Sequence, residues 1–368
     1  MSWPAAALAL MVTAVLIAVL LPWADRLGLV DHPELDGRKD HRASTPLVGG
    51  VAMLAGCLVA FPLTPGDTEA PLAFAAAAAL IVGIGMYDDR HDVRWFWRLG
   101  VHALAALLMT WWGGVRVEQI GPMLGMASTG LGWMAIPFTV FATVGLVNAM
   151  NMIDGSDGLA GSLALAALAM LCAAAVYSGN ISLAGRTLVV AGAVVGFLVW
   201  NLRLPWQPHA RTFMGDAGSG FLGLVVAWVA FRLTQNPGHP VSPMLAVWLL
   251  PIPVMDCLVL IVRRLQERRS PFAAGRDHIH HLMAEAGMGA TAIVLWLTGF
   301  SLAVGLAAAL CLRADVPEML LLGAYLLLCL GWYLLTRRRE RAVALFRRLR
   351  GGSAPPAAAV QSTRQDRA

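Results

Sequence analysis

Long runs of apolar residues, separated by short polar segments, dominate the chain. A helix needs about 20 mostly apolar residues to cross a bilayer, and eleven runs approach that length. Backbone polar groups within a bilayer must be satisfied inside the segment, which favours helices. The sequence therefore predicts an all-α polytopic membrane protein with about eleven transmembrane helices. They cover residues 4–24, 46–64, 71–87, 98–112, 131–148, 159–177, 181–200, 213–233, 242–262, 290–312 and 317–336.

The basic residues are distributed unevenly between the two sides that this arrangement creates. All but four of the 27 Lys and Arg residues lie in alternate loops or in the C-terminal tail, the exceptions being Arg116, Arg186, Arg232 and Arg313. Cytoplasmic loops carry the excess of positive charge in membrane proteins. We therefore expect a periplasmic N-terminus and a cytoplasmic C-terminus. No Lys or Arg precedes Arg26, which argues against a cleaved signal peptide.

Composition supports one membrane-embedded domain. Hydrophobic residues make up 58% of the chain and charged residues 13%, against about 25% charged residues in a soluble domain. We expect a polytopic domain over residues 1–345 and a tail over 346–368. The basic run 337–350 is predicted to form a helix on anionic lipid headgroups, and the chain from Gly351 onward to be disordered.

Two common functions of basic or cysteine-containing chains are excluded. The net charge of +5 is spread over short loops, so no basic domain exists to bind nucleic acid. The five cysteines lie in or beside apolar runs and form no CxxC motif, so neither a disulfide framework nor a cysteine zinc site is expected.

Clusters of polar residues gather in the loops assigned to the cytoplasmic side, and charge beside membrane segments is usually functional. The first, DDRHD, holds Asp88, Asp89 and Asp92 directly after an apolar run. Adjacent carboxylates repel one another, and a divalent cation or an Arg would relieve that repulsion. The alternative is a solvated loop that caps the next helix.

The second cluster, NAMNMIDGSDGLAG, holds Asn148, Asn151, Asp154 and Asp157. The two asparagines are three residues apart and share a helix face. Ligands with only oxygen donors favour a hard cation such as Mg²⁺. The alternative is an N-cap and turn, although four such groups exceed what capping requires.

The third cluster, FMGDAGSG, places Phe213, Gly215, Asp216 and Ser219 at a predicted helix start. Exposed N–H groups and a carboxylate at such a start could hold a phosphate or a metal. It lacks the Lys and the spacing of a P-loop. A simple turn that enters the helix explains it equally well.

The fourth cluster, GRDHIHH, contains Arg276, His278, His280 and His281. Three histidines could bind zinc, but no Cys is nearby, and the Arg suits a diphosphate better. A fifth segment, residues 38–42, is basic. It either sets the topology or attracts an anionic substrate.

These clusters, in this order, resemble the polyprenyl-phosphate N-acetylhexosamine-1-phosphate transferases. The resemblance rests on DDRHD, NMIDGSDGL, FMGDAGS and HIHH and covers roughly residues 1–345. Within that family the chain most resembles the bacterial branch that places GlcNAc-1-phosphate on undecaprenyl phosphate and so begins O-antigen and related surface polysaccharides. The related muramyl-pentapeptide transferase has three adjacent histidines instead of His-Ile-His-His, which argues against a peptide-bearing substrate.

The resemblance implies a Mg²⁺ cofactor, with Mn²⁺ as an alternative, and a location in the bacterial inner membrane. It implies UDP-GlcNAc, undecaprenyl phosphate and membrane lipids as partners, with a homodimer as a candidate assembly. Asp88, Asp89 and Asp216 would be catalytic, and Asp216 and Asn151 would bind the metal. The substrate-binding residues would be Arg98, Asn148, Asp154, Asp157, Phe213, Arg276, His278, His280 and His281.

Alternative functions remain at this point. Another UDP-N-acetylhexosamine could be the donor. A secondary transporter is the competing class, but transporters place polar groups near the bilayer midplane, often in inverted repeats. Here the clusters lie at one face. A purely structural scaffold would leave the acidic clusters unexplained.

Overall fold

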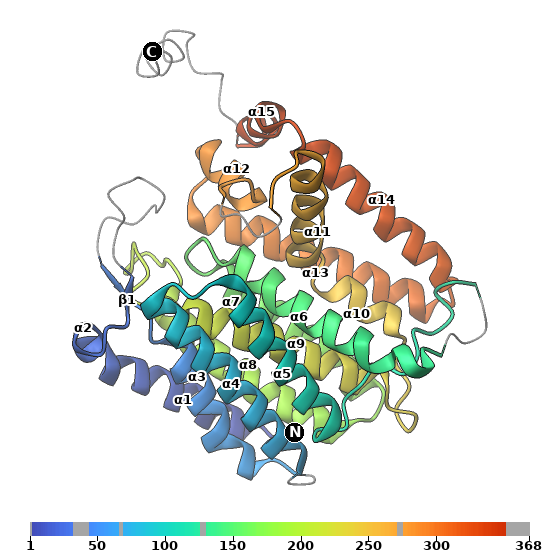
Figure 1. Ribbon diagram of the computed structural model, residues 1–368, viewed down its shortest axis with the longest axis horizontal. Helices are drawn as coiled ribbons and strands as arrows, with labels where there is room; N and C mark the ends of the chain where they lie inside the picture. Colours follow the sequence, from blue (N-terminus) through green and yellow to red (C-terminus); the bar gives the residue numbers. More distant parts are fainter. Residues whose placement is uncertain (1, 32–43, 66–68, 126–129, 271–274, 351–368) are drawn as a thin grey trace.

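The structure, a computed structural model, is almost entirely helical, as predicted (Figure 1). It describes residues 2–31, 44–65, 69–125, 130–270 and 275–350. Two short strands, β1 (Val30–Asp31) and β2 (Thr45–Pro46), pair antiparallel. The α-helices are α1 (Trp3–Leu20), α2 (Ala24–Leu27), α3 (Gly49–Ala60), α4 (Glu69–His91), α5 (Trp95–Trp111), α6 (Ala135–Ile153), α7 (Leu159–Tyr177), α8 (Ile181–Asn201), α9 (Gly215–Thr234), α10 (Pro243–Leu249), α11 (Pro251–Gln266), α12 (Ile279–Glu285), α13 (Ala290–Arg313), α14 (Glu318–Thr336) and α15 (Arg339–Leu349).

Each of the eleven predicted segments coincides with helix. Eight helical spans in the described residues are long and apolar enough to cross a membrane. The apolar helix Gly49–Leu63, formed by α3 and the 3-10 turn η2 (Phe61–Leu63), is shorter, and α5 has 17 residues. The chain is therefore compatible with a multi-pass membrane protein, and the number eleven stays a prediction.

One predicted segment, 242–262, is two helices and not one. Helices α10 and α11 meet at an angle of 79°, with the break at Leu250. Helix α11 begins with Pro251 and contains Pro253 in its first turn. Proline lacks the N–H that a continuous helix needs and is tolerated in a first turn. The two prolines therefore end one helix and start the next.

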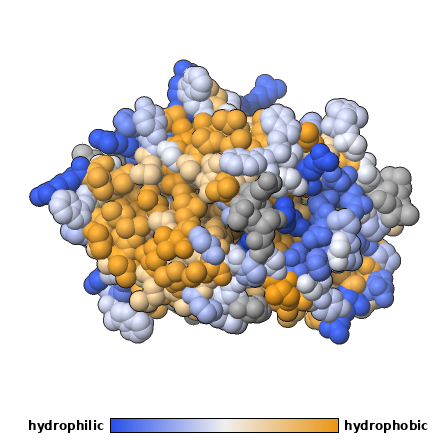
Figure 2. Space-filling model, turned by 90° about the horizontal axis from the view of Figure 1, so that it is seen from below, coloured by the Kyte–Doolittle hydropathy of each residue, from blue (hydrophilic) through white to orange (hydrophobic). Residues whose placement is uncertain are grey.

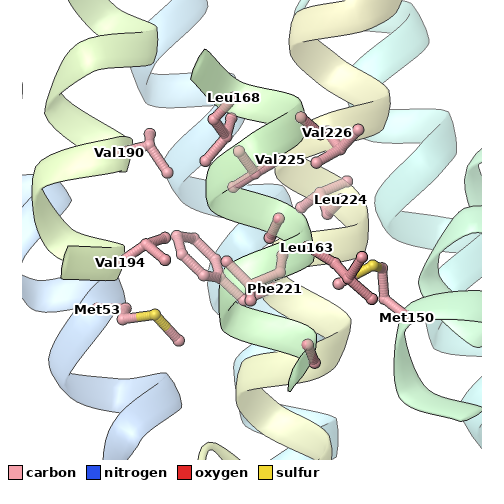
Figure 3. Packing of buried hydrophobic residues seen from close by; sticks show 14 of the residues in the cluster. Met53, Met150, Leu163, Leu168, Val190, Val194, Phe221, Leu224, Val225 and Val226 are labelled. Atoms are coloured by element: carbon pink, nitrogen blue, oxygen red, sulfur yellow. The ribbon is translucent and has the colours of Figure 1, made fainter. Parts of the chain in front are cut away.

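Helix α9 forms the centre of the bundle, surrounded by α3, α4, α6 and α7. Phe221 on α9 is fully buried, and side chains of the surrounding helices gather around it (Figure 3). Gly223 allows the close approach of α6, because a Cβ there would lie 2.5 Å from the Cα of Val147. Small residues at such crossings let helices pack closely inside a membrane protein.

Successive long helices run in alternating directions through the bundle. The C-terminal ends of α4, α6 and α8 meet the N-terminal ends of α5, α9 and α13 around one cavity. Helix α4 continues to His91 and α6 to Ile153. Asp88, Asp89 and Asn151 therefore lie on the last turns of helices and not in loops.

The outer surface is apolar over a wide area, with a hydrophilic region gathered at one side (Figure 2). Large hydrophobic side chains of the outer helices are exposed, such as Met11 on α1 and Leu327 on α14. Monomeric soluble proteins rarely expose contiguous apolar patches of this kind. The surface therefore suits contact with lipid chains.

The basic run after α14 forms the predicted helix, α15, and part of its apolar face is covered. Ala342, Val343 and Phe346 are buried, and α15 packs against α12 and α14. The contact of this basic helix with anionic lipid headgroups stays a prediction. Helix α15 runs across the predicted boundary at 345/346. The predicted disorder from Gly351 onward lies outside the described residues.

Candidate active site

A cavity of about 1360 Å³ opens where these helix ends meet. Four of the five polar clusters contribute to it, although they are far apart in the sequence. The fifth, residues 38–42, lies outside the described residues; Asp31 and Thr45, on either side of it, line the cavity. The predicted site residues in the walls are Asp88, Asp89, Arg98, Asn151, Asp154, Asp157, Phe213, Asp216, His280 and His281.

Arg98 joins the first and third clusters. The chain reverses between α4 and α5 at Asp92, whose φ is +49°, so the first turns of α5 return to the end of α4. Arg98 Nη1 donates to Asp88 Oδ2 and to Asp216 Oδ2, the latter at 2.6 Å. Asp88 is buried, and its Oδ1 accepts the N–H of Val93 at 2.6 Å. One guanidinium thus offsets the repulsion between two carboxylates.

Asp216 is held by contacts from α4 and α6. Asn151 Nδ2 donates to Asp216 Oδ1 at 2.5 Å and to Ser219 Oγ at 3.2 Å. The N–H of Asp216 donates to Asp89 Oδ1 at 2.9 Å. Gly215 has φ +66°, and a side chain there would overlap the Asp89 carboxylate. Only glycine therefore permits this approach of α9 to α4.

The oxygens around Asp216 suit a hard divalent cation. Asp89 Oδ2 is buried and accepts no hydrogen bond from the described residues. In the described part of the chain, no three His, Cys, Asp or Glu side chains form a cluster that could hold a metal alone. Mg²⁺ is commonly bound by one or two carboxylates together with substrate phosphates. The set of Asp89, Asp216 and Asn151 fits that arrangement.

The turn between α6 and α7 carries two acidic residues in different environments. Asp157 Oδ2 accepts from Arg203 Nε at 2.6 Å and from the N–H of Ala210 at 3.2 Å, which ties this turn to the segment after α8. Burial raises the pKa of Asp154 to about 7, with smaller contributions from the charges of Asp89 and Asp157. Asp154 is therefore only partly ionised at neutral pH.

The three histidines of the fourth cluster occupy different positions. His278 Nδ1 lies 2.8 Å from Oδ2 of the buried Asp256 on α11, and His278 does not line the cavity. His280 and His281 do line it. Burial lowers the pKa of His280 well below its usual value, and His281, His278 and Arg276 add to that effect. His280 is therefore neutral at pH 7.

Two further predicted substrate-binding residues lie outside the cavity wall. Asn148 Nδ2 donates to the carbonyl of Val144 at 2.8 Å, one turn back on its own helix. The carbonyl of Arg276 accepts from Arg339 on α15 at 3.2 Å. Spacing correctly placed Asn148 on α6 but could not show that its side chain would bond its own backbone. Phe213 is at the cavity, with its backbone N–H bonded to the Pro46 carbonyl at 2.8 Å.

Several residues at or near the cavity were not predicted. Arg203 and His209 line it from the segment after α8, and their place in a predicted cytoplasmic loop was the available signal. Asn201 lines it too, and its Oδ1 accepts the N–H of Gly158 at 2.8 Å. Asp256 lies inside a predicted apolar segment, where an ionisable residue is in itself a functional signal.

The chain is similar to known proteins over most of its length. Residues 71–234 match the model of glycosyl transferase family 4. The undecaprenyl-phosphate alpha-N-acetylglucosaminyl 1-phosphate transferase of Escherichia coli (strain K12) is 33% identical over 342 residues, 90% of this chain and 91% of that protein.

Proteins of the same name from Yersinia pestis and Haemophilus influenzae are similar as well. Both are 33% identical, the first over 89% of each chain and the second over 77% of this chain and 79% of its own. The chain therefore belongs to glycosyl transferase family 4, in the branch of the polyprenyl-phosphate N-acetylhexosamine-1-phosphate transferases.

Proposed function

We propose that the protein transfers N-acetylglucosamine-1-phosphate from UDP-GlcNAc to undecaprenyl phosphate, giving undecaprenyl-diphosphate-GlcNAc and UMP. We place this reaction at the first membrane step of surface polysaccharide synthesis. Similarity to named transferases over 90% of the chain supports it. The observation that carries it is the network in which Asp88, Arg98, Asp216 and Asn151 connect four helices at one cavity.

The reaction exchanges one phosphorus–oxygen bond for another. An oxygen of the lipid phosphate attacks the β-phosphorus of UDP-GlcNAc. The bond between that phosphorus and the oxygen bridging to the α-phosphorus breaks, and UMP leaves with the bridging oxygen. The second pKa of a phosphate monoester is about 6, so the nucleophile is mostly ionised at neutral pH and needs no strong base.

Arg98 is the residue we assign to the lipid phosphate. Its guanidinium has donors in a planar fork that matches phosphate oxygens, and it is only partly buried, with a side chain 30% exposed. Asp88, beneath it, fixes its position. Asp88 or Asp89 would also accept any proton that remains on the lipid phosphate.

Mg²⁺, or Mn²⁺ in its place, is the cofactor that we propose for Asp216 and Asn151, with Asp89 beside them. When bound, such an ion neutralises the diphosphate and stabilises the departing UMP. The protein's own contribution is to hold the side-chain oxygens of Asp89, Asn151 and Asp216 close together. Asn151 and the backbone N–H of Asp216 orient the two carboxylates through the contacts at 2.5 and 2.9 Å.

The donor would occupy the other side of the cavity. Phe213 can stack on the uracil ring, and Asp154 and Asp157 lie on the nucleotide side. His280 and His281 would contact the diphosphate. Arg203, held by Asp157 at 2.6 Å, adds a cation at the same wall.

The substrates determine where the cavity must be. UDP-sugars are cytosolic, and the prenyl chain lies in the bilayer, so we propose eleven spans in the bacterial inner membrane with the N-terminus periplasmic and the cavity on the cytoplasmic face. Sided labelling tests this with two single-cysteine variants of a cysteine-free chain. His209→Cys should react with an impermeant maleimide only in inside-out vesicles, and Trp133→Cys only in intact cells. The opposite pattern would overturn the orientation.

Turnover of purified protein tests the reaction itself. In detergent, with undecaprenyl phosphate and Mg²⁺, UDP-GlcNAc should yield UMP and a lipid whose mass has increased by GlcNAc-phosphate. A panel of other UDP-N-acetylhexosamines decides the donor. A protein that gives neither UMP nor a lipid product with any donor is not this enzyme, and transport would become the leading alternative.

A further inference from the structure

A buried carboxylate outside the cavity joins helices α11, α12 and α14 next to the histidine cluster. Asp256 on α11 is 2% exposed. Its Oδ2 lies 2.8 Å from His278 Nδ1. Its Oδ1 accepts the N–H of Ile279, at the start of α12, at 3.2 Å. The same oxygen accepts the indole N–H of Trp332 on α14, also at 3.2 Å.

These partners determine where the protons lie. An indole N–H and a backbone N–H can only donate, so both require an acceptor at Oδ1. A buried carboxyl oxygen needs a hydrogen-bond partner as well, and we assign the donor in the contact at Oδ2 to His278 Nδ1. The ring orientation of a histidine and the chemistry of its second nitrogen follow from such a bond.

The orientation of His278 is passed on by ring contacts. The His278 and His280 rings are stacked, with centroids 5.7 Å apart and an interplanar angle of 17°. His280 and His281 have centroids 4.1 Å apart. His280 and His281 line the cavity, whereas His278 does not. Neither ring nitrogen of His280 has a hydrogen-bond partner among the described residues, so packing alone holds that ring.

The break between α10 and α11 makes this connection available. Because α11 starts afresh at Pro251 after a turn of 79°, its second turn carries Asp256 to the base of the histidine cluster. An acidic side chain inside an apolar segment costs free energy and usually marks a functional site.

We propose that Asp256 is a positioning residue for the transfer reaction. It fixes the ring orientation and the Nδ1 proton of His278, and through the stacked rings it holds His280 and His281 toward the donor diphosphate. The inference rests on the proposed function, since it assigns a purpose to the same cavity. A purely structural carboxylate would instead tie α11 to α12 without affecting the donor.

Asp256→Asn separates the two roles. The amide oxygen can still accept from Trp332 and Ile279, but the amide N–H groups would face His278 Nδ1 and force its proton to the other nitrogen. We expect kcat/KM for UDP-GlcNAc to fall by about 10- to 100-fold, the range found when a carboxylate that orients a histidine in a metalloenzyme is removed. The KM for undecaprenyl phosphate should stay unchanged. A structural role would lower kcat and the melting temperature and leave both KM values.

A double-mutant cycle tests whether Asp256 acts through His278. The variant carrying Asp256→Asn and His278→Ala should lose no more kcat/KM than His278→Ala alone, because coupled residues are not additive. Glu318→Gln is the matched control: this acid lies at the far end of α14, bonded to Ser242 at 2.7 Å, and activity should not change.

Four results would overturn the proposal. They are wild-type kcat/KM in Asp256→Asn, a loss of kcat and melting temperature in that variant with both KM values unchanged, losses that multiply in the double variant, and near-wild-type activity of His278→Ala. The last decides the matter even where Asp256→Asn does not fold. Wild-type protein that makes no lipid product would overturn the proposed function first, and this inference with it.

Discussion

Replacing Asp216 by Asn distinguishes a metal-binding carboxylate from a member of a simple ion pair. Asp216 Oδ2 accepts a hydrogen bond from Arg98 Nη1 at 2.6 Å, and Asp88 shares the same guanidinium. Asp216 Oδ1 accepts one from Asn151 Nδ2 at 2.5 Å. Without a metal, removing this negative charge would ease the approach of two anionic substrates, and turnover would stay equal or rise. With a metal, losing the ligand removes the ion that screens the phosphates.

The size of the effect follows from electrostatics. Two unit charges about 4 Å apart interact by roughly 4 kcal/mol at an effective dielectric of about 20, which corresponds to about three decades in rate. We therefore expect UMP release by Asp216→Asn to fall about a thousandfold. The assay uses purified protein, undecaprenyl phosphate, UDP-GlcNAc and excess Mg²⁺, with the melting temperature as a measure of folding.

Ser219→Ala is the control for this experiment. It removes a neutral acceptor 3.2 Å from Asn151, and one such hydrogen bond contributes about 1 kcal/mol, so the loss should stay below about tenfold. If folded Asp216→Asn keeps more than a tenth of wild-type turnover, the metal assignment is wrong.

Further predictions concern three neighbouring positions. Gly215→Ala should reduce turnover more than tenfold and lower the melting temperature, because φ is +66° and the added Cβ meets a carboxylate; Gly83→Ala, with no atom within 4 Å of its Cβ, should do neither. Arg203→Ala leaves Asp157, whose side chain is 10% exposed, without its ion pair. The KM for UDP-GlcNAc should then rise about fivefold, equivalent to about 1 kcal/mol, and an unchanged KM would remove Arg203 from the donor side. Because folding raises the pKa of Asp154 from 3.8 to about 7, the folded state binds the extra proton between those values, and stability falls as pH rises through them. Asp154→Asn should therefore raise the melting temperature at pH 8 but not at pH 4, and an equal change at both would contradict this.

The sequence predicted which polar segments would meet, but not all of the partners within them. Apolar run length and Lys/Arg distribution were enough to place Asp88, Asn151 and Asp216 at one end of the helices. The structure confirms that they lie together: Asp216 is hydrogen-bonded to Asn151 and to Arg98, which also bonds Asp88. Run length and charge distribution can be read from one segment at a time, because the free-energy cost of placing a residue in the membrane depends mainly on that segment's own composition.

Contacts between segments depend on how helices pack, which no single segment encodes. The pairing of Asp157 with Arg203 and the turn of His278 toward Asp256 both join residues from different elements. The break before Pro251 was visible as two prolines within three residues, yet run length alone merged α10 and α11 into one segment. A proline and an acidic residue inside an apolar run were thus the two local signals of this part of the site.

The most direct test of the account follows the β-phosphorus of the donor. UDP-GlcNAc labelled with ³²P at the β-position is incubated with purified protein, undecaprenyl phosphate and Mg²⁺, and the lipid and aqueous phases are separated. Transfer of GlcNAc-1-phosphate predicts that the label enters the lipid in step with unlabelled UMP release. Label that stays in water as UDP, with GlcNAc alone on the lipid, would contradict the account.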